Sequence, residues 1–218
     1  MAIYNAGYLS PIRKKLGNAV GRKWRTLDVL AVYQPFVSNP NTRAQQLVRT
    51  RFAAAASLSN RFKRALLLGF ANICKGTKVP ERSMFIRKNW GVISADSPGA
   101  ATVDYTETVI AEGPLPECQF GNATFAEPLQ VAVAMTDTSD VDGADAHDKV
   151  YLFVYSPEAD AGIISDGRNT RADESASVNV PAYWNGHRVH VWGFAVGAGI
   201  DNKGVISNSR YIGSGTIS

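Results

Sequence analysis

The stretch "KVYLFVYS", from Lys149 to Ser156, decides the fold class of this chain of 218 residues. Aromatic and β-branched residues dominate it, and this composition favours a β-strand. The loop before it, residues 137–148, is rich in Asp and Gly, which are turn-forming residues. The sequence therefore predicts a strand that is bounded by turns.

Similar signals recur on both sides of this stretch, from about residue 92 to the C-terminus. The other candidate strands are "ATVDYTETVIA", "LQVAVAM", "SASVNVP", "HRVHVWGFAVG" and "VISNSRYIGSG". Strands that follow one another without intervening helices form antiparallel sheets, because parallel strands need crossover helices. We therefore predict an immunoglobulin-like β-sandwich over residues 91–218.

The preceding segment, residues 41–90, has helical periodicity. Asn41 or Thr42 can cap a first helix, in which apolar residues recur at helical spacing, and a second helix is predicted from Ser59 to Cys74. Gly76 follows as a terminator. Because each predicted helix has one apolar face, both must pack against another layer, and the downstream sheet is the candidate.

Residues 1–40 alternate short apolar pieces with glycine and proline. The piece "DVLAVYQPFV" predicts a short strand that ends before Pro35, since proline lacks the amide that a sheet requires. The segment is predicted to be an extended basic arm with at most one hairpin. The expected class is thus α+β, with an arm, two helices and an antiparallel sandwich.

Charge is strongly segregated along the chain, although the net charge is only +4. Residues 1–90 hold seventeen Lys and Arg against two acidic residues (+15), and residues 91–218 hold six against seventeen (−11). Two opposite fields in one molecule can steer an acidic partner to one end or stack copies head to tail.

The two cysteines, Cys74 and Cys118, lie in different segments without metal-binding spacing. This favours reduced thiols and a cytosolic origin over a disulfide or a zinc site. No stretch approaches the apolar length of about 20 residues that a membrane helix needs. We expect neither a signal peptide nor a membrane span.

The acidic loop at residues 137–148 holds five aspartates and His147, which makes it a candidate calcium site. Its spacing fails the EF-hand pattern, since Thr138 and Lys149 fall at the first and last ligand positions. A solvated turn-rich loop is the simpler interpretation. His187 and His190 lie on opposite faces of a predicted strand and are not expected to share a metal.

Motifs for catalysis and for nucleotide cofactors are absent from the sequence. No GxGxxG follows a strand, no GxxxxGK[ST] occurs, and a Ser, His and Asp set lacks the GxSxG nucleophile turn. We expect a protein that is not an enzyme and that uses no cofactor.

The basic segment of the predicted arm is the candidate site for binding a partner. Its members surround one tryptophan and are Arg13, Lys14, Lys15, Arg22, Lys23, Trp24 and Arg25. Three interpretations stay open: contacts with nucleic-acid phosphates with stacking on Trp24, a solvated surface with Trp24 anchored to the core, and docking on the acidic sandwich of a neighbouring subunit.

The run "KKLGNAVGRKWRTLDVLAVYQPFVSNPNTRAQQLVRTRFAAA" resembles the opening of an uncharacterised domain family common in Bacteroidetes, with a GxxVGxxW motif followed by NPxTxxQxxxRxxF. The matching positions are Gly17, Val20, Gly21, Trp24, Asn39, Pro40, Thr42, Gln46, Arg49 and Phe52. The C-terminal strands also look like that family's β region. The resemblance implies no activity. More loosely, the layout is similar to the ring and tail-barrel proteins of crAss-like phages.

We therefore expect a non-enzymatic structural protein of a multi-subunit assembly, namely a ring-like homo-oligomer in a phage virion that also contacts other assembly proteins near the tail, ring or portal. The basic arm and the helices would make the contacts between subunits. The alternative is a nucleic-acid-binding module of the bacterial cytoplasm that uses the basic half of the chain.

Overall fold

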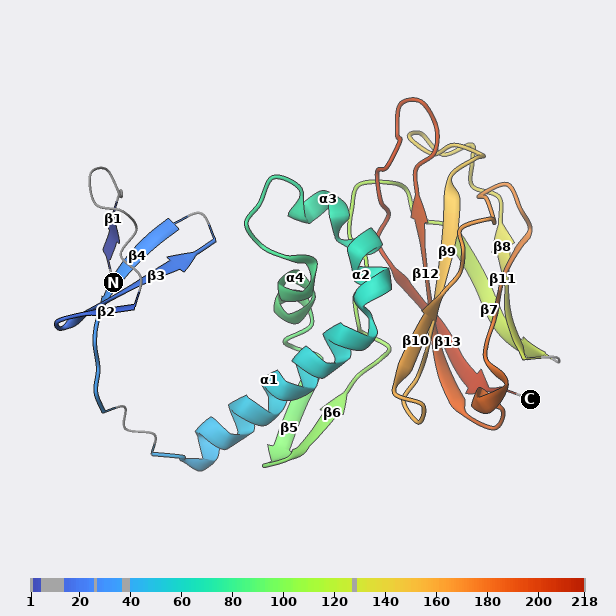
Figure 1. The fold of residues 1–218 in the computed structure, drawn as a ribbon. Coiled ribbons are helices and arrows are strands. Elements are labelled where there is room, and N and C mark those ends of the chain that lie inside the picture. The colour runs from blue at the N-terminus through green and yellow to red at the C-terminus, as the bar shows by residue number, and fades with distance from the viewer. Residues whose placement is uncertain (1, 5–13, 26, 37–39, 127–128, 218) are drawn as a thin grey trace. The chain divides into compact units, whose positions relative to one another are not determined.

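The computed structural model describes residues 2–4, 14–25, 27–36, 40–126 and 129–217 (Figure 1). It divides into two compact units, Met1–Thr42 (unit 1) and Arg43–Ser218 (unit 2). The chain is a mixed α+β protein, as predicted, and the described residues form four α-helices and several antiparallel sheets.

Unit 1 contains a sheet where the sequence predicted an extended arm. Its four strands pair antiparallel in the order β1-β4-β3-β2. They are β1 (Ala2–Tyr4), β2 (Lys14–Leu16), β3 (Ala19–Trp24) and β4 (Leu27–Val32). The predicted strand at "DVLAVYQPFV" corresponds to β4, and the expectation of at most one hairpin is corrected to a meander of β2, β3 and β4 with β1 on its edge.

Two tight turns produce this meander. Gly17 has φ of 58° and is the first residue of the two-residue turn between β2 and β3, where glycine suits hairpin geometry. Arg25 begins the turn between β3 and β4 and also has a positive φ, 57°, which is uncommon for a residue with a side chain. The Tyr33 amide donates to the Asn18 carbonyl at 2.7 Å and holds the chain after β4 against the first turn.

Unit 2 begins with four helices instead of the two that were predicted. They are α1 (Arg43–Arg61), α2 (Lys63–Gly69), α3 (Ala71–Cys74) and α4 (Glu81–Lys88). The predicted helix from Ser59 to Cys74 is divided at Phe62 and Phe70, whose rings are fully buried. Among the described helices, none combines the length and the apolar character that crossing a bilayer requires.

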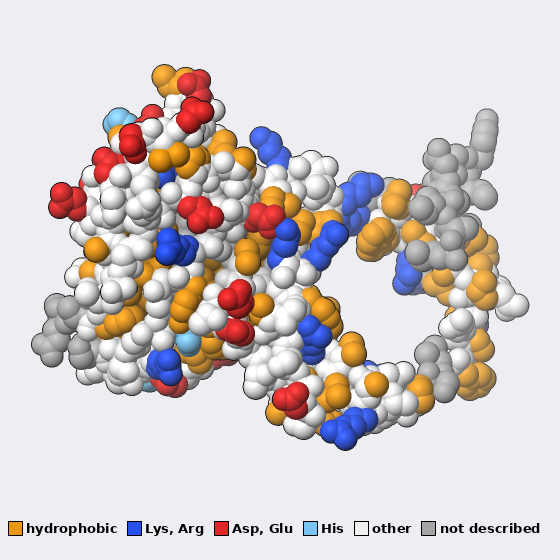
Figure 2. All heavy atoms as spheres, turned by 180° about the vertical axis from the view of Figure 1, so that it is seen from behind, with side chains coloured by type: hydrophobic (Ala, Val, Ile, Leu, Met, Phe, Trp, Pro, Cys, Tyr) orange, Lys and Arg blue, Asp and Glu red, His pale blue; other side chains and the backbone are white. Residues whose placement is uncertain are grey.

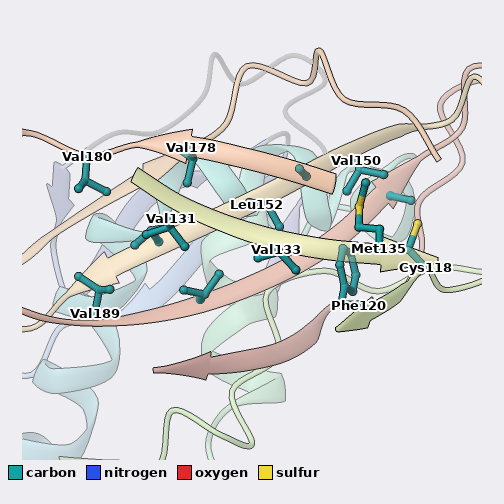
Figure 3. Packing of buried hydrophobic residues seen from close by; sticks show 14 of the residues in the cluster. Cys118, Phe120, Val131, Val133, Met135, Val150, Leu152, Val178, Val180 and Val189 are labelled. Carbon is teal, nitrogen blue, oxygen red and sulfur yellow. The ribbon is translucent and has the colours of Figure 1, made fainter. Parts of the chain in front are cut away.

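Seven strands of unit 2 form two facing antiparallel sheets. One has the order β11-β8-β7 and the other β10-β9-β12-β13. Their bounds are β7 (Gln119–Ala126), β8 (Gln130–Thr136), β9 (Lys149–Ser156), β10 (Ala161–Ile164), β11 (Ser175–Asn179), β12 (Arg188–Val196) and β13 (Arg210–Thr216). The core between them includes Val133, Leu152 and Val189 (Figure 3).

The opening stretch forms β9 over its whole predicted length, and β8, β11 and β12 also lie where they were predicted. The long strand that was expected over residues 101–111 ends at Val103, and the residues before that point form β6 (Ala100–Val103), which pairs with β5 (Ile93–Ser97) in a hairpin next to α1. The strands of the sandwich therefore begin at β7, and the expectation that the sandwich starts at residue 91 is corrected.

The central strands β9 and β12 are buried on both faces. Val150, Leu152 and Val154 point into the core between the sheets, while Phe153 and Tyr155 pack under the helices. Phe62 is the centre of that second cluster, with its ring centroid 4.7 Å from Phe153 and 5.5 Å from Trp192. The helices thus cover the outer face of the four-stranded sheet (Figure 1).

Substituting Gly69 with alanine should destabilise this helix layer. A Cβ at Gly69 would lie 2.7 Å from Ala111 Cβ and still closer to the Ile110 carbonyl, and both neighbours are fully buried. We expect a loss of about 1–3 kcal/mol in the free energy of unfolding, the usual cost of overpacking. Urea denaturation measures it, with Gly91→Ala as the matched control because nothing lies within 4 Å of that position. Equal stabilities of the two variants would contradict the packing described here.

Candidate interaction surface

The strand register of unit 1 sorts the candidate residues onto two faces, because directly opposed residues of an antiparallel pair share a face. Arg22 is opposite Val29, Trp24 is opposite Leu27, and Lys15 is opposite Val20. Since Val20, Arg22 and Trp24 alternate along β3, Lys15, Arg22 and Trp24 lie on one face, which we name the Trp24 face.

The remaining candidates are separated from this face. Lys14, opposite Gly21, and Lys23, opposite Asp28, lie on the reverse of the sheet, and Arg25 is in the turn. Arg13 lies outside the described residues. The structure therefore brings together Lys15, Arg22 and Trp24 and places Arg25 next to them, a partition that the sequence pattern alone did not predict.

The Trp24 face combines aromatic rings with cations. The Lys15 ammonium lies 3.8 Å from the centroid of the Tyr33 ring, and the Arg25 guanidinium lies 5.8 Å from that of Trp24, both within cation–π range. Trp24 keeps 58% of its surface exposed. A hollow of about 260 Å³ is lined by Arg22, Lys23, Trp24 and Val29. Such a surface can hold an anionic group and cover an apolar one beside it.

Unit 1 buries little apolar surface within itself. Within residues 14–25 and 27–36, Val29 is the one hydrophobic side chain that is buried, at 1% exposed. Leu16, Val32 and Phe36 are 62%, 77% and 93% exposed. Exposed apolar side chains at this density are typical of a surface that binds a partner.

Acidic side chains gather at the end of the sandwich formed by residues 137–148 and 199–202 (Figure 2). Beneath them, a buried ion pair joins Asp148 and Arg171 at 3.2 Å, and both side chains are fully buried. Asp148 also accepts hydrogen bonds from the Asp145 and Ala198 amides. This pair fixes the loops that carry the exposed acids.

The exposed carboxylates of this end are held in their charged form. The His147 backbone amide donates to Asp145 and lowers the pKa of that carboxyl, and the Ser139 amide does the same for Asp137. In the described part of the chain, no three Asp, Glu, His or Cys side chains converge as metal ligands do, so the calcium hypothesis gains no support.

One arrangement of hydrolase-like residues occurs in the sandwich but lacks the geometry of a catalytic triad. Ser156 Oγ and the Glu158 carboxylate approach the same ring nitrogen of His187, Nδ1, at 3.3 and 3.9 Å. A triad needs the nucleophile and the acid on opposite nitrogens. Ser156 is moreover fully buried, and its hydroxyl accepts a hydrogen bond from the Ala159 amide, which indicates a role in the turn after β9.

The fold and the surface define a class: an α+β protein in which a small basic sheet precedes a helix-covered, two-sheet β domain. The sequence model described as "Family of unknown function (DUF6266)" matches residues 11–213, and the chain belongs to this family. The prediction of an uncharacterised domain family is therefore confirmed at that level. No curated protein matches the chain.

Proposed function

We propose that this protein is a non-enzymatic structural component of a multi-subunit assembly, and that unit 1 contacts a neighbouring subunit through its Trp24 face. The observation that carries the proposal is the composition of unit 1. Unit 1 is a separate compact sheet of basic and aromatic residues whose large apolar side chains are mostly exposed.

A sheet of this kind gains from a partner. Domains of about 40 residues generally need disulfides, metals or oligomerisation, because their own core is too small. Unit 1 contains no cysteine, and Val29 is the one buried hydrophobic residue within 14–25 and 27–36. Burial of Trp24 at a contact between subunits would supply the missing apolar area.

The distribution of charge along the chain indicates which partner unit 1 binds. Unit 1 carries six Lys and Arg against one Asp, while residues 91–218 carry a net charge of −11. Docking of unit 1 on the acidic sandwich of a neighbouring copy joins opposite charges, and repetition of this contact gives a ring-like homo-oligomer. The similarity to ring and tail-barrel proteins makes a phage virion, with other assembly proteins beside this one, the assembly that we propose.

We also propose that the sandwich is immunoglobulin-like. The constant-type immunoglobulin arrangement places the first, second, fifth and fourth strands in one sheet and the third, sixth and seventh in the other. Here the strands β7, β8 and β11 and the strands β9, β12 and β13 follow that division. One strand differs, because β10 pairs with β9 instead of β11.

Nucleic-acid binding is the second candidate function, and the exposed Trp24 beside Arg25, on the same face as Lys15, favours it, since bases stack on aromatic rings within basic surfaces. If it is correct, single-stranded DNA or RNA should bind, and affinity should fall by up to about 300-fold between 50 and 200 mM salt, the value for phosphate contacts by all six cations of unit 1. Fluorescence anisotropy with labelled oligonucleotides measures this. Absence of salt-sensitive binding removes the candidate.

Replacing Trp24 with alanine should weaken self-association by about 30-fold, which corresponds to the roughly 2 kcal/mol of an aromatic anchor at an interface. Sedimentation velocity measures the change. Tyr183→Ala is the matched control, because Tyr183 is an aromatic residue of unit 2 with 65% exposure. A lower melting temperature with unchanged association would show that Trp24 packs within its own subunit, and would contradict the proposal.

A further inference from the structure

Helix α1 has an apolar stripe that is covered along its second half and open along its first. Val48, Phe52, Ala55 and Ser59 follow one another at helical spacing and lie on one side of the helix. Ala55 and Ser59 are fully buried, whereas Val48 and Phe52 are 56% and 54% exposed.

Helix α4 covers the second half of this stripe. The Arg82 side chain of α4 donates to Ser59 Oγ at 3.3 Å. On another side of α1, the first half is held by the β5–β6 hairpin and its approach, where Gly99 donates to Thr50 Oγ1 at 3.0 Å and Arg51 stacks over Trp90 at 4.1 Å. The first half is therefore fixed in place while Val48 and Phe52 face outward.

The charge of α1 determines which kind of surface can bind the exposed Val48 and Phe52. Its nineteen residues include Arg43, Arg49, Arg51 and Arg61 and no acidic residue. The α1 helix of a second copy, or the basic unit 1, would bring like charges together. An acidic surface with an exposed apolar side chain would complement both the arginines and the apolar stripe of α1.

The acidic end of the sandwich is a surface of that kind. A hollow of about 410 Å³ is lined by Asp142, Asp145 and Asp201, and Ile200 projects beside them with 98% of its surface exposed. Within unit 2, this end and the first half of α1 lie at opposite extremes (Figure 1), so one copy cannot satisfy both surfaces by itself.

We infer that the acidic end of one copy, with Ile200 as its apolar anchor, docks on the Val48–Phe52 stripe of a second copy. The contact joins two different surfaces, so it is heterologous and propagates into a ring or a filament. The inference rests on the proposed function: it adds a second contact, made by other residues, that forms once the Trp24 face has joined the copies.

Crosslinking between single-cysteine chains tests the contact directly. A Phe52→Cys chain is mixed with an Ile200→Cys chain and treated with a short bismaleimide; the native Cys74 and Cys118 are buried. We expect a crosslinked dimer in a yield at least about tenfold above that of the control mixture, since docking raises the effective concentration of the two thiols. The control replaces Phe52→Cys with Leu67→Cys, at an exposed leucine of α2.

The outcomes separate this inference from the proposed function. If the wild-type chain self-associates but the Phe52→Cys and Ile200→Cys mixture yields no more dimer than the control, the inference is wrong and the proposed function stands. If the wild-type chain stays monomeric at every concentration, both fail. A crosslink within one chain that carries Phe52→Cys and Val32→Cys would place unit 1 on the stripe and overturn the inference.

Discussion

Replacing Arg171 with methionine should lower the free energy of unfolding by about 3–5 kcal/mol, because the change leaves the Asp148 carboxylate buried without its counter-charge. The guanidinium is fully buried and lies 3.2 Å from that carboxylate. It also donates to Thr138 Oγ1 and to the Pro116 carbonyl, each at 2.8 Å. These acceptors would lose their donor in the variant, which adds to the cost.

Arg168→Met is the matched control for this experiment. Arg168 also pairs with an aspartate, Asp166, at 2.8 Å, but both side chains are largely exposed. An exposed ion pair contributes about 0–1 kcal/mol, so this control should stay close to the wild-type stability. Urea denaturation followed by circular dichroism measures both variants. An Arg171→Met protein within about 1 kcal/mol of the Arg168→Met protein would contradict the role of the buried pair.

The same pair supports the acidic end of the sandwich. Asp148 Oδ1 accepts from Asn202 Nδ2 at 2.9 Å, and the Asn202 amide group also donates to the Gly143 carbonyl at 3.2 Å. The loops that carry Asp142, Asp145 and Asp201 are thereby tied to one buried centre. Stability of the sandwich and the shape of its acidic surface are linked through Arg171.

The strands that the sequence predicted are the ones with dense apolar runs. β9 and β12 are buried on both faces, so almost every residue in them is apolar or aromatic. β7 contains Gly121 and Asn122, and β10 has four residues, so neither carries a composition that separates it from a loop. Tertiary pairing with β8 and β9 makes them strands.

Only part of the helical region was predicted correctly, because apolar periodicity does not show where a helix is interrupted. Phe62 and Phe70 continue the apolar spacing of a single helix, and their amides still donate to the carbonyls four residues earlier. Their backbone dihedrals depart from helical values, with ψ of 0° at Phe62 and 9° at Phe70, and α1, α2 and α3 result. Helix α4 carried a readable signal: Pro80 directly before it, Glu81 in its first turn, and Arg87 and Lys88 in its last.

The sequence predicted which residues form the candidate surface but not how they are arranged on the sheet. Its basic and aromatic composition is visible in the sequence, whereas the face that each side chain occupies depends on the strand register. The dipeptide Gly17-Asn18 is a hairpin signal, and once it is placed as a turn it fixes the pairing of β2 with β3. This pairing places Lys15 on the Trp24 face and Lys14 on the opposite face of the sheet.

Replacing Lys15 and Arg22 with glutamate should abolish higher-order assembly. Both residues lie on the Trp24 face, and the double change lowers the charge of unit 1 from +5 to +1 and places two glutamates of that face against the acidic sandwich of a neighbour. The sandwich should keep its stability, because unit 1 is a separate compact unit. Lys63→Glu with Arg64→Glu is the control, since it makes the same change of charge at two exposed residues of α2.

Sedimentation velocity of the full chain over a range of concentrations tests the central claim most directly. The wild-type protein and the Lys63→Glu, Arg64→Glu control should form species well above the 23.5 kDa monomer, and the Lys15→Glu, Arg22→Glu variant should sediment as that monomer. A wild-type chain that stays at 23.5 kDa throughout, or a Lys15→Glu, Arg22→Glu variant that assembles as the wild type does, would contradict assembly through the Trp24 face.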